Sequence, residues 1–314
     1  MKVTEHIIQA KHPLISFEII PPKRGSKLED LLKVIDTLAK YNPPFIDVTS
    51  HAAEVEYEET PEGIRRRVKR KRLGVIGICT VLQHKYKIDA VPHLLCQGFT
   101  REETEDVLIE FHYSGIRNAF AVRGDENGYH KPLTEGKTAN EYAVDLVTQI
   151  TAMNRGKYLT PLLDAESTDF CIGVAGYPEK HYEAPNMTTD ILHLKEKVDA
   201  GAQYIVTQMF FDNEHYFNFV EKCRSSGITV PIIPGLKIIT SKEQLTRIPK
   251  RFHLEIPYDL TKEIEESPEH ATEIGIAWTT AQVEKLIQKG APSVHFYVMQ
   301  NASAVEEVLK KIGY

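Results

Sequence analysis

The sequence of 314 residues is poor in cysteine, and its four cysteines lie far apart, at Cys79, Cys96, Cys171 and Cys223. It contains no CxxC pair and no histidines at zinc-finger spacing, which argues against a disulfide framework and against a metal site. No apolar run approaches the length of a membrane span, and the first residues lack the apolar core of a signal peptide. These absences predict a cytoplasmic protein with reduced thiols and no membrane partner.

Common nucleotide-binding motifs are missing as well. No GxGxxG follows the first apolar run, no P-loop is present, and Gly74-Val75-Ile76-Gly77 lies inside a run that we interpret as a strand. A Rossmann-type dinucleotide site is therefore not expected. The net charge of −6 gives no electrostatic reason to expect a nucleic acid as a partner.

What the sequence does contain is a regular alternation of apolar runs and helical patterns. Eight runs are apolar almost throughout, which is typical of strands in a parallel sheet covered on both faces. They are Leu14–Ile20, Phe45–Ser50, Gly74–Leu82, Asn118–Gly124, Cys171–Gly176, Tyr204–Phe210, Pro231–Leu236 and Ser293–Met299. The helical patterns are Ser26–Tyr41, Thr100–Gly115, Thr138–Asn154, Thr188–Gly201, Asn213–Gly227, Ser241–Arg251, Glu273–Gly290 and Ala302–Ile312.

This alternation over 314 residues predicts an α/β protein, a (β/α)8 TIM barrel formed by a single domain of residues 1–314. A doubly wound open sheet is the alternative. The sequence has no internal repeat and no Gly/Ser linker that would mark a domain boundary. Residues 154–169 interrupt the rhythm, and we expect an inserted loop or hairpin there.

One carboxylate stands inside the first apolar run, Ile15-Ser16-Phe17-Glu18-Ile19-Ile20-Pro21-Pro22. The two prolines end the strand because neither can donate a ladder hydrogen bond. Burying the Glu18 carboxylate is costly unless it is paired or its pKa is raised. The segment alone leaves two interpretations, a proton donor or a structural carboxylate neutralised by Lys or Arg. Because no basic residue stands nearer in sequence than Lys23, we expect the pKa of Glu18 to be raised.

Polar residues also follow the other predicted strands, where a barrel of this kind carries its chemistry. They are Thr49-Ser50-His51, Pro92-His93-Leu94, Arg123-Gly124-Asp125, Tyr177-Pro178-Glu179-Lys180-His181 and Thr207-Gln208. A ring of such residues at one rim predicts a pocket with several polar contacts and one acid of raised pKa.

Two other features invite different functional readings. The basic run Arg65-Arg66-Arg67-Val68-Lys69-Arg70-Lys71-Arg72 is interpreted as a solvated helix face or a subunit contact. It has no interleaved aromatic residues and belongs to a net acidic protein, which argues against nucleic-acid binding. His51 and His84 are expected on the surface or in loops, because no cluster of His, Cys and carboxylates accompanies them.

Seven motifs occur in order along the chain. They are Ser16-Phe17-Glu18-Ile19-Ile20-Pro21-Pro22, Arg123-Gly124-Asp125, Gly176-Tyr177-Pro178-Glu179-Lys180-His181, Lys195-Glu196-Lys197-Val198-Asp199-Ala200-Gly201-Ala202, Thr207-Gln208-Met209-Phe210-Phe211-Asp212, Ile233-Pro234-Gly235 and His295-Phe296-Tyr297. Together they resemble the catalytic domain of the methylenetetrahydrofolate reductase family. The resemblance extends over nearly the whole chain, from Ser16 to Tyr297.

The resemblance implies a flavin-containing barrel of one-carbon metabolism, with a role in methionine biosynthesis. In that family NADH or NADPH reduces FAD, and the flavin passes a hydride to 5,10-methylenetetrahydrofolate, giving 5-methyltetrahydrofolate. By resemblance, Glu18 is the general acid that protonates the departing nitrogen and opens the methylene bridge to an electrophilic iminium. Asp125 matches the catalytic acidic residue close to flavin and pterin. Gln208 matches an amide that contacts the pterin, and Gln244 a further folate contact.

The resemblance also implies a set of FAD-binding positions. They are Thr49, His93, Arg123, Gly124, Asp125, Tyr142, Ala143, Ala175, Tyr177, His181, Asp190 and Lys197. Among these, Arg123 and Lys197 would meet the pyrophosphate charge, and Tyr177 would offer an aromatic face to the flavin ring.

The chain departs from the family pattern at three positions. His193 stands where the family often has Asn, and Glu196 stands where a basic residue is common beside the diphosphate. Asn301 stands where an Arg often meets the folate tail. The choice between NADH and NADPH stays open, and a homo-oligomer is expected. The alternative functions are the same flavin barrel taking electrons from a partner protein such as ferredoxin, and a folate-binding protein without turnover.

Overall fold

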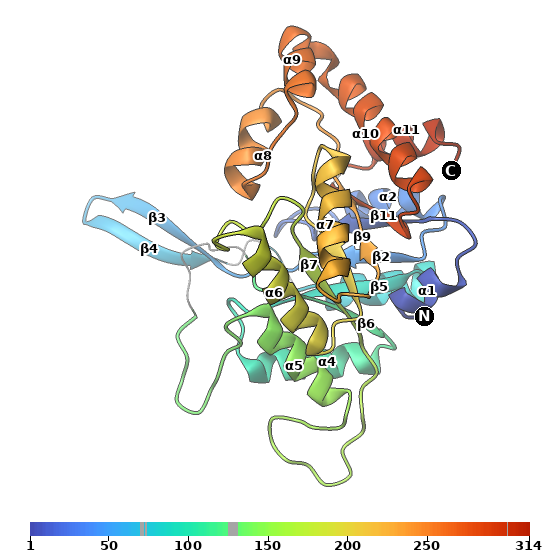
Figure 1. The fold of residues 1–314 in the computed structure, drawn as a ribbon. Coiled ribbons are helices and arrows are strands. Elements are labelled where there is room, and N and C mark those ends of the chain that lie inside the picture. Colours follow the sequence, from blue (N-terminus) through green and yellow to red (C-terminus); the bar gives the residue numbers. More distant parts are fainter. Residues whose placement is uncertain (70–71, 73, 125–130, 300) are drawn as a thin grey trace.

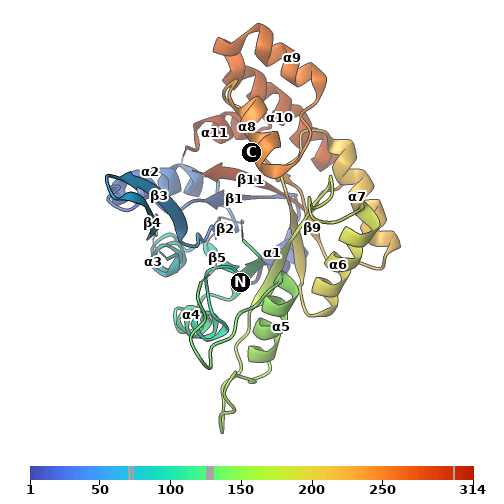
Figure 2. The same ribbon diagram turned by 90° about the vertical axis from the view of Figure 1, so that its left-hand side faces the viewer.

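A parallel sheet of short strands forms the centre of the molecule (Figures 1 and 2). The computed structural model describes residues 1–314 except 70–71, 73, 125–130 and 300. The strands are β1 (Leu14–Ile19), β2 (Phe45–Val48), β5 (Asp89–Leu95), β6 (Asn118–Val122), β7 (Cys171–Gly176), β8 (Tyr204–Thr207), β9 (Ile232–Ile233), β10 (Gly235–Leu236) and β11 (Ser293–Met299). Their spatial order is β10-β11-β1-β2-β5-β6-β7-β8-β9, with parallel pairing throughout.

The two ends of this order meet in one short segment. β9 pairs with β8 and β10 pairs with β11, and only Pro234 separates β9 from β10. The same segment therefore closes the sheet into a barrel of eight strand positions, and the predicted (β/α)8 fold is confirmed. Gly235 is required at this point, because a Cβ there would lie 2.3 Å from the carbonyl oxygen of Thr207.

Helices surround the barrel, as the view of Figure 2 shows. They are α2 (Leu28–Ala39), α3 (Ile76–Val81) with the π-helical turn η1 (Leu82–Tyr86), α4 (Arg101–Tyr113), α5 (Ala143–Met153), α6 (Met187–Asp199), α7 (Asn213–Ser225), α10 (Ala271–Gln288) and α11 (Ser303–Lys311). The main core lies between the barrel and these helices, where outward side chains such as Phe17, Ile46 and Phe296 are buried. Helix α4 begins with a capping box, in which Thr100 and Glu103 bond reciprocally.

Two further parts complete the fold. Helix α1 (Val3–Gln9) packs Val3 and Ile7 against inward barrel residues, and the Val3 amide donates to Asn118 at the start of β6. Beyond the barrel, α8 (Gln244–Phe252), α9 (Tyr258–Glu266) and the turn η2 (Pro268–His270) form a projection with α10. That projection has a small core of its own, which includes Ile248 and Leu260. Helix α9 was not predicted from the sequence.

The predicted strand Gly74–Leu82 is wrong. This segment is helical, in α3 and the start of η1, and the third barrel strand is β5 (Asp89–Leu95). A short apolar run can be a strand or a buried helix, and periodicity alone does not separate the two. Within β5, Pro92 makes the run look unsuitable for a central strand, although it lies opposite Val48 of β2.

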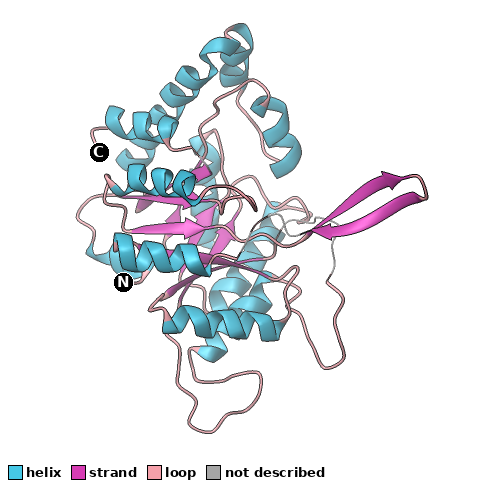
Figure 3. Cartoon of the chain, turned by 180° about the vertical axis from the view of Figure 1, so that it is seen from behind, coloured by secondary structure: helices cyan, strands magenta, loops and turns pink. Residues whose placement is uncertain are grey.

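The basic run was also placed in the wrong kind of element. Residues 65–69 of the run belong to an antiparallel hairpin, β3 (Glu54–Thr60) and β4 (Gly63–Lys69), which projects from the barrel (Figure 3). Acidic residues of β3 face basic residues of β4, and Glu58 accepts from Arg67 Nε at 2.9 Å. In β3 charged and apolar residues alternate as in a strand, whereas the three successive arginines of β4 give no such signal. Between α5 and β7, residues 154–170 form neither helix nor strand.

Candidate active site

Glu18 lies at the carboxyl end of β1, facing the barrel interior. Its neighbours Phe17 and Ile19 point outward into the main core, so strand alternation turns Glu18 inward. The register of β1 against β11 shifts at this point, because Glu18 pairs with Tyr297 but Ile19 pairs with Met299. A bulge at a barrel rim is a common way of aiming a side chain into a site.

Two further inward residues surround the Glu18 carboxylate. Asp47 lies opposite Glu18 on β2, and His93 lies on β5. The Nε2 atom of His93 is 3.3 Å from Asp47 Oδ2 and 3.6 Å from Glu18 Oε2. Both carboxylates are buried, and Asp47 is 1% exposed. The three side chains form an acid cluster, defined here as Glu18, Asp47 and His93.

Burial raises the pKa of Glu18 to about 7. The charges of His93 and Lys237 lower that pKa, and the charge of Asp47 raises it, but burial outweighs them. Burial alone would lower the pKa of His93, yet its hydrogen bond to Asp47 and the charges of Glu18 and Asp47 raise it overall. The expected rise in the pKa of Glu18 is confirmed, and the carboxyl is partly protonated at neutral pH.

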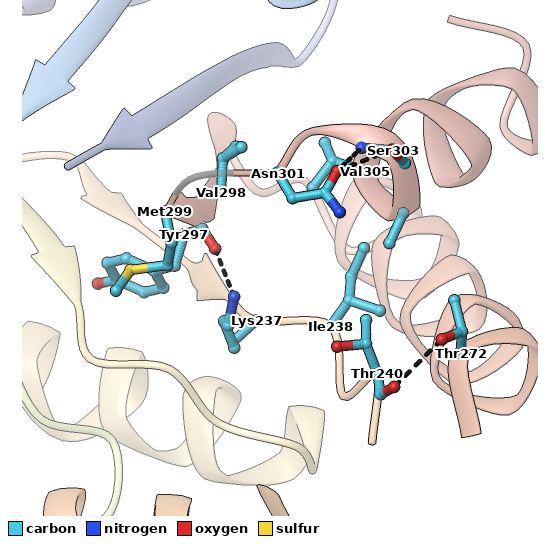
Figure 4. Close-up of a pocket in the computed structure, with 11 residues that line it drawn as sticks. Lys237, Ile238, Thr240, Thr272, Tyr297, Val298, Met299, Asn301, Ser303 and Val305 are labelled. Carbon is cyan, nitrogen blue, oxygen red and sulfur yellow. Dashed lines mark hydrogen bonds between the residues drawn. The ribbon is translucent and has the colours of Figure 1, made fainter. Parts of the chain in front are cut away.

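A cavity of about 460 Å³ lies at the end of β11, where Tyr297, the residue that pairs with Glu18, forms part of its wall (Figure 4). Its lining comes from the segment after β10, the start of α10, the end of β11 and the start of α11: Lys237, Ile238, Thr240, Thr272, Tyr297, Val298, Met299, Asn301, Ser303, Ala304 and Val305. Lys237 Nζ donates to the Tyr297 carbonyl at 3.1 Å. Burial lowers the pKa of Lys237 to about 8, and its charge acts on Glu18. The cavity thus joins a buried cation to several hydroxyl and amide groups.

A second polar cluster follows β6 and β7. The Arg123 guanidinium lies 5.4 Å from the centre of the Tyr142 ring and forms an ion pair with Glu183. The His181 ring meets the Tyr177 ring edge-on, with 4.6 Å between centroids. Arg123, Tyr142, Tyr177 and His181 were all predicted as cofactor contacts, and the structure places Arg123 with Tyr142 and Tyr177 with His181.

Four further predicted cofactor positions, Thr49, Ala175, Asp190 and Lys197, make hydrogen bonds to this cluster, to one another or to the residue after Glu18. The His181 amide donates to Asp190 Oδ2 at 2.9 Å, and Lys197 Nζ donates to the Ala175 carbonyl at 2.9 Å. Burial lowers the pKa of Lys197 to about 8. The Thr49 amide donates to the carbonyl of Ile19, the residue after Glu18.

Four predicted positions contribute little further geometry. Gly124 adopts a left-handed backbone with φ +99°, and Ala143 is the first residue of α5. Gln208 follows β8, and its side-chain oxygen accepts from the next amide at 2.9 Å. Gln244 Oε1 accepts from the amide of Thr240, a cavity-lining residue, at 2.7 Å. One more predicted position, Asp125, lies outside the described residues.

Sequence reasoning missed three functional candidates: Asp47, Lys237 and Glu183. Asp47 carries the same signal as Glu18, a carboxylate inside an apolar strand, Phe45-Ile46-Asp47-Val48. Lys237 follows the Ile233-Pro234-Gly235 motif by two residues, at a strand end. Glu183 carries no signal of its own, because only the folded loop brings it to Arg123.

Among the described residues, no group of three or more His, Cys, Asp or Glu side chains is arranged to hold a metal ion. Within the same residues, no helix is both long enough and apolar enough to cross a membrane. The four cysteines are buried and form no disulfide.

The fold and the acid cluster define a TIM barrel with an acid–base site at the carboxyl rim of its strands. Comparison with known families is more specific. The model of the methylenetetrahydrofolate reductase family matches residues 2–313, and the chain belongs to this family.

Curated relatives agree with that assignment. The 5,10-methylenetetrahydrofolate reductase of Escherichia coli (strain K12) is 31% identical over 302 residues, covering 95% of this chain and 90% of its own length. Methylenetetrahydrofolate reductase 1 of Schizosaccharomyces pombe is 32% identical over 323 residues, covering 100% of this chain. The chain spans 48% of that longer relative.

A solved structure shares the fold at low sequence identity. It is an uncharacterised protein from Clostridium thermocellum that binds two copies of 5-methyl-5,6,7,8-tetrahydrofolic acid. The TM-score is 0.62 at 15% identity, over 99% of both chains. At this identity the likeness concerns the fold alone.

Proposed function

We propose that this chain is a flavin-dependent oxidoreductase that reduces 5,10-methylenetetrahydrofolate to 5-methyltetrahydrofolate, with NADH or NADPH as electron donor. The observation that carries the proposal is Glu18, a buried acid whose pKa is raised to about 7, at the rim of a barrel of the methylenetetrahydrofolate reductase family. The names of its relatives support this reaction.

The chemistry of the substrate explains why such an acid is needed. The methylene carbon bridges two nitrogens and is a poor hydride acceptor until one C–N bond opens. We assign to Glu18 the transfer of its carboxyl proton to the departing nitrogen, which leaves an electrophilic iminium at the other nitrogen. A carboxyl of ordinary pKa would be almost wholly ionised at neutral pH, whereas a pKa of about 7 keeps part of Glu18 protonated.

The residues at the rim fit FAD. Thr49 Oγ1 is buried and makes no hydrogen bond within the described part of the chain, so it has a polar atom to offer a ligand. Arg123 is 28% exposed and supplies a cation for a pyrophosphate, and Tyr177 and Tyr142 supply aromatic surface. When bound, FAD would supply the hydride chemistry between the nicotinamide and the folate.

The remaining predicted contacts take the folate. Gln208 would hold the donor–acceptor edge of the pterin, and Asp125 would stabilise the transient positive charge. Gln244 lies beside the cavity of about 460 Å³ through its bond to Thr240. Asn301 stands in the cavity wall in place of an Arg, and among the described residues that line the cavity Lys237 supplies a cation for an anionic part of the substrate.

The deciding experiment is an anaerobic absorbance titration of the purified protein. The proposal predicts a yellow protein whose flavin band is bleached by NADH or NADPH and restored by methylenetetrahydrofolate. A colourless preparation that takes up no FAD would refute it. If reduced ferredoxin bleached the flavin but NADH and NADPH did not, the result would support a protein electron donor instead.

The variant Glu18→Gln tests the role of the acid. We expect reduction of the flavin by NADH to stay within about twofold of the parent, and folate reduction to fall by at least 10². Reduction of methylenetetrahydrofolate at the parent rate would show that Glu18 is not the acid. Folate binding with no turnover in the parent itself would support the binding-protein alternative.

We also propose a homo-oligomeric protein that works in the cytoplasm. The β3–β4 hairpin supports self-association, because one of its faces exposes Tyr57 (70%), Ile64 (73%) and Val68 (48%). A two-stranded sheet is marginally stable by itself, and exposed apolar patches often mark contacts between proteins. One strand is acidic and the other basic, so the hairpin is complementary in charge to a second copy of itself.

A further inference from the structure

We propose that Asp47 is a positioning residue of the acid site: it holds His93 in a fixed orientation beside Glu18 and favours its charged form, and so sets how readily Glu18 gives up its proton. This inference rests on the proposed function in one respect, namely that Glu18 is the acid of the reaction. The resemblance to the family assigned no role to Asp47.

The first support is geometric. His93 Nε2 lies between the two carboxylates, 3.3 Å from Asp47 Oδ2 and 3.6 Å from Glu18 Oε2. The imidazole also packs on the Phe120 ring, with 4.8 Å between centroids. The shorter contact is to Asp47, so Asp47 and Phe120 fix the ring while Glu18 keeps the looser contact and stays available to a substrate.

The second support is the cost of burying Asp47. Its side chain is 1% exposed, and Oδ1 has no hydrogen-bond partner within the described part of the chain. The hydrogen bond from His93 is therefore the compensation that the described residues offer this carboxylate. A charged imidazole compensates a buried carboxylate far better than a neutral one.

The groups facing the pair from other strands do not replace this interaction. From β11, His295 shares a hydrogen bond with Ser16, and burial lowers the pKa of His295 to about 4, so it is uncharged at neutral pH. Tyr297 on β11 and Tyr204 on β8 are phenols whose pKa burial raises well above the ordinary value. Among the described residues, the other cation whose charge acts on Glu18 is Lys237, which lines the cavity.

The effect of Asp47 on Glu18 has two opposing parts. Directly, the negative charge of Asp47 raises the pKa of Glu18. Indirectly, Asp47 raises the pKa of His93, and the positive charge of His93 lowers the pKa of Glu18. The influence of His93 on Glu18 is the larger of the two. Removing Asp47 from the parent therefore raises the pKa of Glu18, whereas removing Asp47 after His93 is gone lowers it.

This reversal of sign gives a sharp test with four proteins: the parent, Asp47→Asn, His93→Gln and the double variant. The apparent pKa of the folate half-reaction is measured by single-turnover reoxidation of the reduced flavin over a range of pH. Asp47→Asn and His93→Gln should each move this pKa up, on the order of one unit. The double variant should lie below His93→Gln. Asp30→Asn on the exposed surface of α2 is the matched control and should leave the profile unchanged.

A second measurement does not depend on FAD binding or on turnover. The carboxyl stretch of protonated Glu18 is followed by infrared titration in the same proteins, with Glu18→Gln as the reference. The proposal is supported if the pKa of Glu18 measured in this way is higher than the parent's in Asp47→Asn and in His93→Gln, and lower in the double variant than in His93→Gln. An unchanged pKa in Asp47→Asn, or a shift in the same direction with and without His93, overturns it. If the parent failed to reduce folate, the proposed function would fall, while the infrared titration would still decide the role of Asp47.

Discussion

Burial gives the ionisable residues at the rim different protonation states at the same pH. It raises the pKa of Glu18 to about 7 and lowers that of Lys237 to about 8. His295, one strand from Glu18, stays neutral because its pKa is lowered to about 4. The barrel therefore holds a carboxyl that is partly protonated, a lysine that loses its proton more readily than usual, and a neutral imidazole. This arrangement is suited to proton transfer.

The pH dependence of folate reduction follows from Glu18. In the proposed mechanism the protonated form of Glu18 is the active one, so the rate of the folate half-reaction should be constant below a pH of about 7 and fall tenfold per unit above it. Stopped-flow reoxidation at fixed substrate concentration measures this profile. A rate that rises through neutral pH would contradict the assignment.

Glu18 should also cost the folded protein stability at high pH. Its folded pKa of about 7 exceeds the ordinary 4.5, so the unfolded state loses this proton first as pH rises. The free energy of unfolding therefore falls as the pH rises from 4.5 to about 7. Above pH 7 it stays lower, by at most about 3 kcal/mol. Glu18→Gln removes this cost, and its melting temperature relative to the parent should be higher at pH 8 than at pH 5. An equal difference at both values would show that Glu18 is not buried as an acid.

At the scale of elements, the chain closes its barrel with very short strands. β9 and β10 have two residues each, and side chains reinforce their pairing. The Gly235 amide donates to Thr207 Oγ1 at 2.9 Å, and the Tyr297 hydroxyl donates to the Thr207 carbonyl at 2.6 Å. Thr207 thus links β8, β10 and β11 exactly where the cavity begins.

Gly235→Ala should weaken this closure. The added Cβ would meet the Thr207 carbonyl and the Tyr297 ring, so we expect a loss of about 1–3 kcal/mol in the free energy of unfolding. Gly77→Ala in α3 is the matched control, since nothing lies within 4 Å of its added Cβ and alanine favours a helix. Urea unfolding of both variants measures the difference. Equal stability of the two would show that the closure tolerates a side chain.

At the scale of the whole molecule, the β3–β4 hairpin projects from the barrel and exposes an apolar face formed by Tyr57, Ile64 and Val68. Ile64→Ser should lower the association constant of the homo-oligomer at least tenfold, because it removes apolar area from the proposed contact. Arg65→Ser, on the opposite face, is the control and should have a smaller effect. Sedimentation equilibrium measures both. A monomeric parent would refute the homo-oligomer, and an oligomer insensitive to Ile64→Ser would place the contact elsewhere.

The amino-acid sequence by itself determined the barrel class, most of the strands and the acid. Apolar runs between helical patterns are local signals, and Glu18 stands out because a carboxylate is rare in such a run. Tertiary structure decided what no local pattern carries. The segment Gly74–Leu82 became helical while β5 took the third strand position. The pairing of Asp47 with His93 depends on two strands meeting side by side, and the pKa of Glu18 depends on how much water that meeting excludes.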